Sequence, residues 1–208
     1  MFGKRISIVV NFHYLRIMNG ENIFIRQATP DDATLIAKAV TMGIGHEDTL
    51  RNYCGDNYLQ VLSDISKQTG MLYSYENAFV AVCDNKAVGA IVGYDGAQFD
   101  KLRQATCQYI KECTGCMPDT CNETETGEFY IDTLAVMPEH RHLGIGKKLI
   151  VHLCEEAFCW GHTHVGLLVD PANSKAQALY TSVGFKNVGD KPFFDLPMYH
   201  FQRINSKE

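Results

Sequence analysis

Two glycines at the start of a predicted helix are the feature that most limits how this chain can fold. The stretch 128–138, EFYIDTLAVMP, is the strongest predicted strand, and an amphipathic helix is predicted over 145–160. Gly144 and Gly146 fall at the turn between the two elements. Because glycine costs about 1 kcal/mol in a helix relative to alanine, the pattern indicates that something must approach the bare backbone here.

A strand, a glycine turn and a helix together make a seat for a phosphate group. The first turn of a helix exposes unpaired N–H groups and a partial positive charge. A P-loop is excluded, because Arg141 stands where that motif needs glycine and Lys148 stands where it needs Ser or Thr. A dinucleotide fingerprint is excluded by Leu149, which occupies the position of the third glycine. The pattern that remains is Arg-x-x-Gly-x-Gly.

The other elements alternate between strand and helix, which predicts a mixed α/β domain. Thr29, Pro30 and the following acids mark a helix start after the first strand. Strands are predicted over 22–28, 78–84, 86–96, 164–170, 185–189 and 197–203, and helices over 29–43, within 46–69, over 97–113 and over 173–183. The segment 114–127 is rich in Thr, Glu, Gly and Pro and is expected to be an exposed loop.

Length and composition fit one globular domain. The chain has 208 residues, 46% of them hydrophobic and 21% charged. We expect an extension over 1–21 and a single domain over 22–208, with 97–127 as an inserted helix and loop. The net charge of -5 argues against a nucleic-acid partner. Charges interrupt every apolar run, and the run at 6–10 is too short for a signal peptide, so we expect a cytoplasmic protein without a membrane partner.

The eight cysteines divide into two groups of four. Those at 54, 83, 154 and 159 lie singly or in apolar patterns and are expected to be small buried hydrophobes. The others form the stretch CQYIKECTGCMPDTC, in which Cys113 and Cys116 make a C-x-x-C pair. A zinc knuckle or a redox pair is one interpretation. An insertion that happens to carry thiols is favoured, because the spacing does not repeat and no histidine lies nearby.

Two stretches give the chain a resemblance to a known family. LAVMPEHRHLGIGKKL resembles the acetyl-CoA pyrophosphate motif of the GNAT superfamily of N-acetyltransferases. DPANSKAQALYTSVGF resembles its second block, with Asn173, Tyr180, Gly184 and Phe185 at the matching positions. The resemblance runs from about residue 22 to the C-terminus and is most specific over 128–186. The segment GEFYIDTLAVMPEHR further resembles a bacterial subgroup of unassigned substrate. One departure is His-Leu at 142–143, where Arg-Gly or Lys-Gly is more usual.

The resemblance implies a fold and a reaction. The fold is the α/β acyl-CoA N-acyltransferase fold, a central, mixed but mostly antiparallel twisted sheet flanked by helices. The reaction is direct attack by a primary amine of a small molecule or peptide on acetyl-CoA, the co-substrate, in a ternary complex without a metal. Members are often dimers, so a homodimer is one expectation. The alternative is a regulatory module of the same fold that binds CoA without turnover.

The resemblance also assigns residues to the binding of acetyl-CoA. It implies that backbone groups of the strand hold the pantetheine arm and that backbone amides of the turn hold the pyrophosphate. Arg141 would add positive charge near the phosphates, and Asn173 would bond the pantetheine amides. The alternative for Asn173 is a helix-cap residue. Lys147 and Lys148 are explained equally well as exposed charges on the helix. The expected binding residues are Leu134, Ala135, Val136, Arg141, His142, Leu143, Gly144, Ile145, Gly146, Lys147, Asn173 and Tyr180.

Acetyl transfer needs a base for the amine and a proton for the departing thiolate. The resemblance gives the proton to Tyr180, whose alternative is an amphipathic core tyrosine. Alternation places Glu128, Tyr130 and Asp132 on one face of their strand, so Asp132 and then Glu128 are candidate bases. Asp132 is alternatively structural, and Glu128 alternatively solvated at the strand mouth. Expected walls of the acceptor pocket are Glu47, Phe193, Phe194 and Tyr199.

Overall fold

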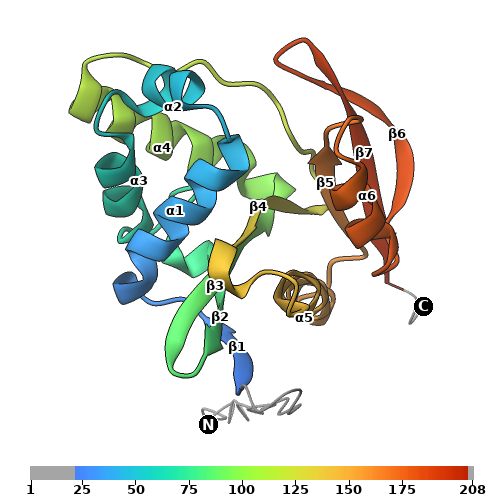
Figure 1. Ribbon diagram of the computed structural model, residues 1–208. Coiled ribbons are helices and arrows are strands. Elements are labelled where there is room, and N and C mark those ends of the chain that lie inside the picture. Colours follow the sequence, from blue (N-terminus) through green and yellow to red (C-terminus); the bar gives the residue numbers. More distant parts are fainter. Residues whose placement is uncertain (1–21, 206–208) are drawn as a thin grey trace, which may run out of the picture.

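The computed structural model describes residues 22–205, so the predicted extension over 1–21 lies outside the described part. A seven-stranded sheet with the order β1-β2-β3-β4-β5-β7-β6 runs through the molecule (Figure 1). Every neighbouring pair is antiparallel except β4 and β5, which are parallel. The strands are β1 (Ile23–Gln27), β2 (Ala78–Cys83), β3 (Lys86–Asp95), β4 (Phe129–Val136), β5 (His164–Val169), β6 (Lys186–Phe193) and β7 (Leu196–Ile204).

Six α-helices in the described residues cover the sheet. They are α1 (Ala33–Ile44), α2 (Glu47–Cys54), α3 (Tyr58–Ser66), α4 (Phe99–Thr114), α5 (Ile145–Cys159) and α6 (Ser174–Thr181). Short 3-10 helices are η1 (Pro30–Asp32), η2 (Tyr75–Asn77), η3 (Gly96–Gln98) and η4 (Pro138–His140). Figure 1 shows α1 to α4 gathered on one side of the molecule and β5, β6, β7 and α6 on the other.

The sheet separates two hydrophobic cores. On one face, α1 packs on β3 and β4, and its Ile36 and Val40 are fully buried with residues of α3 and α4. On the opposite face, α5 packs on β1 to β5 through Leu149 and Leu153. Each helix therefore buries one apolar stripe, as its spacing of three and four residues predicts.

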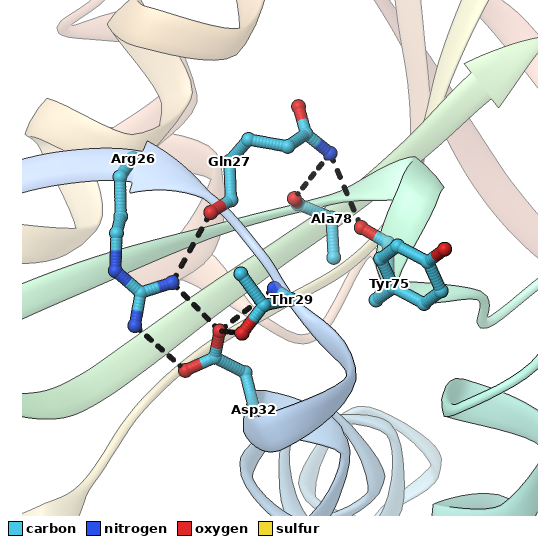
Figure 2. Close-up of polar contacts among 6 residues, drawn as sticks. All are labelled: Arg26, Gln27, Thr29, Asp32, Tyr75 and Ala78. Carbon is cyan, nitrogen blue, oxygen red and sulfur yellow. Dashed lines mark hydrogen bonds and ion pairs between the residues drawn. The ribbon is translucent and has the colours of Figure 1, made fainter.

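The start of α1 is fixed by a polar junction with β1 (Figure 2). Arg26 donates to both carboxylate oxygens of Asp32, at 2.6 and 2.9 Å. The same carboxylate accepts from the amide and the hydroxyl of Thr29, at 2.8 and 3.0 Å, which completes a capping box. Burial by itself raises the pKa of Asp32, but the Arg26 and Thr29 hydrogen bonds outweigh burial and lower it.

Most predicted elements are present, with shifted ends. The region 46–69 forms two helices, α2 and α3, and the hairpin between β2 and β3 turns at Asp84 and Asn85, both with positive φ. Strands β6 and β7 are longer than predicted, because they pair with each other along their length. The expectation that Cys159 is buried is wrong, since this last residue of α5 is exposed, whereas Cys54, Cys83 and Cys154 are buried.

Candidate active site

The sheet opens between β4 and β5. Only Phe129 and Tyr130 of β4 pair with β5, opposite Val165 and Gly166. Beyond that point β5 continues along β7, whereas β4 stays paired with β3 alone among the described residues. The backbone of β4 from residue 131 onward therefore presents unpaired N–H and C=O groups to the opening. An extended ligand with amide groups can add to such an edge as a strand does.

A β-bulge interrupts β4 at the opening. Thr133 pairs with Val92 and Ile131 with Gly93, so Asp132 is the extra residue without a partner in β3. In a regular strand, residues 131 and 134 would point to opposite faces of the sheet. Because of the bulge, Ile131, Leu134 and Val136 all pack toward α5. Asp132 and Thr133 are thereby both turned toward the α1 side, where Thr133 meets Gly43 of α1. Bulges of this kind commonly re-aim side chains beside active sites.

The glycine turn presents a run of free amides. Lys148 makes the first helical bond of α5, to the Gly144 carbonyl at 3.1 Å. Within the described residues, none of the six amides from His142 to Lys147 donates to a protein acceptor. These N–H groups lie at the positive end of α5, so the turn has the donors and the potential that a pyrophosphate requires.

The two glycines have different reasons to be glycine. Gly144 has φ +73°, a left-handed conformation that its own backbone requires, and His142 is also left-handed at φ +66°. Gly146 is an ordinary helical residue. A Cβ there would lie 3.8 Å from Leu179 and 3.9 Å from Val136, which is normal van der Waals contact. The protein fold therefore does not need glycine at 146, which points to a ligand that does.

The charged side chains of the turn are partly used by the protein. Arg141 donates through Nε to the Val136 carbonyl at 3.1 Å, which ties the turn to the end of β4. The exposed side chain of Lys147 reaches the Ser182 carbonyl after α6, at 3.4 Å. The turn, β4 and α6 thus converge at one end of the opening.

Helix α6 brings Tyr180 to this convergence. Its ring packs on Phe185, with ring centroids 5.8 Å apart, and its hydroxyl has no hydrogen-bond partner among the residues that the structure describes. Burial raises the pKa of Tyr180 to about 12, so the phenol stays protonated at neutral pH. Asn173 caps α6 by accepting from the Ala176 amide at 3.1 Å, so its side-chain oxygen is already engaged.

Asp132 lies in a cluster of hydroxyl groups. Its oxygens accept from Tyr94 and from Thr133, each at 2.8 Å. Burial raises the pKa of Asp132, although both hydrogen bonds oppose the shift. A buried carboxylate with a raised pKa beside two hydroxyl donors is a candidate functional group.

A second carboxylate, not foreseen from the sequence, reaches the same cluster. Glu123 accepts from the Tyr130 hydroxyl at 3.3 Å, and the Tyr130 and Tyr94 rings are 6.0 Å apart. Burial and the charge of Asp132 raise the pKa of Glu123 to about 8. The segment 114–127 is mostly exposed, as predicted, but Thr124 is buried and Glu123 is half-buried. No periodicity in this segment marks Glu123, so only the fold could reveal it.

Glu128 is buried rather than solvated. It is 3% exposed and accepts from Thr124 at 2.9 Å and Gln202 at 2.8 Å, and its carboxylate lies 2.9 Å from His200 Nε2. Burial works against ionisation, but the His200, Gln202 and Thr124 bonds lower its pKa. The carboxylate fills the space above Gly166, where a Cβ would lie 1.9 Å from Glu128 Oε2. Glu128 therefore joins β4 to β5 and β7.

The expected acceptor walls are spread over two places. Glu47 pairs with Arg51 at 2.8 Å and lines an open groove of about 520 Å³ that Lys38 and Arg141 also line. Phe193 and Phe194 pack edge to face at the tip of the β6–β7 hairpin, and Tyr199 stacks on Phe201. A smaller cavity of about 240 Å³ lies by Trp160, at the far end of α5 from the glycine turn.

None of the eight cysteines, all of which lie in the described residues, forms a disulfide. Cys113 and Cys116 are exposed at the end of α4, and Cys107 is buried. Within residues 22–205, no group of three or more His, Cys, Asp or Glu side chains is arranged to hold a metal ion. No helix in this range is both long and apolar enough to cross a bilayer.

A sheet that opens beside a helix N-terminus has the groups that can hold an extended ligand ending in phosphates. The acetyltransferase (GNAT) family matches residues 48–185, more than half of the chain. The chain belongs to this family, and the predicted GNAT fold is confirmed. The predicted single-domain boundaries stay a prediction.

Two solved structures resemble the chain over nearly their whole length. A crystal structure of an acetyltransferase is 27% identical, covers 87% of this chain and 98% of its own, and has a TM-score of 0.75. An N-acetyltransferase from Staphylococcus aureus Mu50 is 28% identical, with coverage of 86% and 99% and a TM-score of 0.75. An N-acetyltransferase from Thermoplasma acidophilum, solved with coenzyme A, shares the fold at 19% identity, with coverage of 88% and 99% and a TM-score of 0.54.

One curated relative matches a shorter stretch. An uncharacterized protein of Mycobacterium leprae (strain TN) is 38% identical over 65 residues, which is 31% of this chain and 17% of that protein. The matched stretch is a small part of that longer protein, so it carries no information on the activity of the whole.

Proposed function

We propose that this protein transfers the acetyl group of acetyl-CoA to a primary amine. The observation that carries the proposal is the glycine turn, whose six free amides lie at the N-terminus of α5 beside the open edge of β4. Gly146 supports it, because the fold has room for a side chain there. Family membership supports acetyl transfer in general, and the neighbour solved with coenzyme A supports this cofactor.

The residues that could hold acetyl-CoA follow one another from the glycine turn along the open edge of β4. The amides from His142 to Lys147, with Arg141 beside them, would hold the pyrophosphate. The backbone of Leu134, Ala135 and Val136 would hold the pantetheine amides along the open edge. The amide of Asn173 retains two N–H donors for the same arm, since only its oxygen is engaged in the cap.

Tyr180 is proposed as the proton donor to the departing thiolate. A phenol with a pKa of about 12 is fully protonated at neutral pH, and this hydroxyl has no protein partner among the described residues to compete with the sulfur. Asp132 is proposed as the carboxylate that faces the amine, because the bulge turns it toward the α1 side at the point where β4 and β5 part. Glu128 is assigned a positioning role in the β4–β5–β7 junction.

The test is thiol release from acetyl-CoA with a panel of primary amines, with product mass measured in parallel. We expect amine-dependent thiol release and acetylated amine. The alternative, a regulatory module that binds CoA without turnover, would show a raised melting temperature with CoA and only background thiol release for the whole panel. Cytoplasmic location and a homodimer belong to the same proposal and are tested by cell fractionation and by light scattering.

A further inference from the structure

The segment 115–127 between α4 and β4, here called the strap, crosses one end of the opening. Figure 1 shows it leaving α4 at the top of the molecule and passing over to the start of β4. Arg103 of α4 donates to the Asn122 side chain at 2.8 Å and to the Cys121 carbonyl at 3.4 Å. The strap is thus fixed to the helical side of the opening.

The other side of the strap is fixed to the C-terminal strands. Lys191 of β6, whose side chain is 15% exposed, lies 3.1 Å from the Glu125 carboxylate. The Cys121 thiol meets the backbone of Phe194 at the β6–β7 hairpin. The strap therefore joins two parts of the molecule that the opening separates.

The strap is also pressed against η3, which directly follows β3. A Cβ at Gly96 would lie 2.1 Å from the Glu125 carbonyl oxygen and 2.8 Å from Thr124 Oγ1. No side chain fits at 96 unless the strap moves, so this glycine serves the close approach. Thr124 in turn donates to the buried Glu128. The strap is therefore packed as a fixed wall at one end of the opening between β4 and β5.

Glu123 is carried by the strap into the cluster around Asp132. Its hydrogen bond with Tyr130 and the adjoining Tyr94–Asp132 bond place the two carboxylates at the ends of one tyrosine pair. The charges that face Glu123 are Arg103 from α4, Lys191 from β6 and Asp132 from β4. Arg103 also pairs with Asp100 and Lys191 with Glu125, so neither cation is committed to Glu123 alone and the two carboxyl groups can receive a cationic ligand.

We propose, resting on the acetyl transfer above, that Glu123 is the base that takes the amine's proton and that the strap limits the acceptor to small amines. Asp132 would hold the incoming ammonium, and Glu123 would accept one proton from its nitrogen. The freed lone pair then attacks the thioester carbon. As the carbon–sulfur bond breaks, Tyr180 gives its phenolic proton to the sulfur. A second proton from the nitrogen then returns to the Tyr180 oxygen. The products are the acetylated amine, the CoA thiol and one proton, which passes from Glu123 to solvent.

Small amines are favoured over peptides for a geometric reason. A peptide that presents an internal lysine to Asp132 has chain on both sides of that lysine, and the strap occupies one of those sides. Contacts with α4, η3 and β6 hold it there. Two carboxylates and an aromatic pair suit a compact cation.

The experiment compares Glu123→Gln with Asp119→Asn, an exposed carboxylate of the same strap. We expect kcat/KM for small amines to fall about 10²- to 10⁴-fold in E123Q and to stay at the wild-type value in D119N. In wild type the rising limb of kcat/KM should have an apparent pKa near 8, and E123Q should lose it. Unchanged CoA affinity in both variants shows that the fold and the CoA site are intact.

Two results would overturn the inference while leaving the proposed function standing. One is an E123Q variant with the wild-type rate and pH profile. The other is a wild-type protein that acetylates lysine-containing peptides and rejects small amines. Absence of any acetylated product, with CoA still bound, would overturn the proposed function and this inference together.

Discussion

Gly146 is the residue whose identity the protein fold leaves unexplained. Its neighbour Gly144 must be glycine because of its left-handed backbone. At 146 an alanine would meet Leu179 and Val136 at ordinary distance, and would save the entropy that glycine costs in a helix. A position that gives up stability without a steric need is best explained by function.

We therefore expect opposite effects of Gly146→Ala on stability and on binding. Stability should rise by about 0.5–1 kcal/mol, seen as a small increase in Tm without ligand. CoA affinity should fall, because the new methyl group would intrude on the proposed phosphate seat. Gly146→Glu should abolish CoA binding through bulk and negative charge. Calorimetric titration measures both affinities, and normal affinity in G146E would contradict the placement.

A substitution at Tyr180 distinguishes an effect on catalysis from an effect on CoA binding in the proposed site. Its hydroxyl makes no bond with other described residues, and its ring packs on Phe185. Tyr180→Phe keeps the ring and removes only the proton donor. We expect CoA affinity near wild type and turnover lowered about 10²-fold or more. Thiol release under saturating substrates is the measurement, and unchanged turnover would remove Tyr180 from the chemistry.

At the scale of elements, α1 depends on its junction with β1. Asp32 is 6% exposed and accepts two bonds from Arg26 and two from Thr29. The helix that it starts packs on β4, which carries Asp132. A weakened junction would thus loosen the wall of the site as well as the core.

We expect Asp32→Ala to lower the free energy of unfolding by about 2 kcal/mol, through the lost cap and charged hydrogen bonds. Asp31→Ala, at an exposed neighbour, is the matched control and should change little. Because the pKa of Asp32 is lowered by folding, its contribution is present above the unfolded pKa of about 3.9 and is lost as pH falls through the folded value. Urea titrations at neutral and acidic pH test this, and equal loss in both variants would contradict it.

The glycine turn and the order of elements were predictable, because both depend on the spacing of residues that are close in the sequence. The chemistry around Asp132 was only partly so. Alternation correctly groups Tyr130 with Asp132, but the bulge shifts every later residue to the other face, and its position depends on pairing with β3. Burial of Glu128 depends on Gly166 and His200, which are distant in sequence. Glu123 lies in a segment without periodicity, so its place near Asp132 arises only from tertiary contacts.

The whole molecule consists of two parts joined by little pairing. The β4–β5 seam has two paired positions, and the Glu128 junction and the strap supply other ties. A ligand that adds to β4 while resting on the turn and on α6 would join these parts across the opening. Its binding should therefore stabilise the whole fold and not only a loop.

We expect CoA at about 100 times its Kd to add about 2.7 kcal/mol to the free energy of unfolding. For a chain of 208 residues this corresponds to an increase in Tm of about 5–10 °C. Hydrogen exchange should slow at the amides of 142–147 and along β4 after residue 131, because these are the groups that gain acceptors. G146E is the control that should show neither change. Protection confined to the surface near Trp160, with the turn unaffected, would place the ligand in the smaller cavity instead.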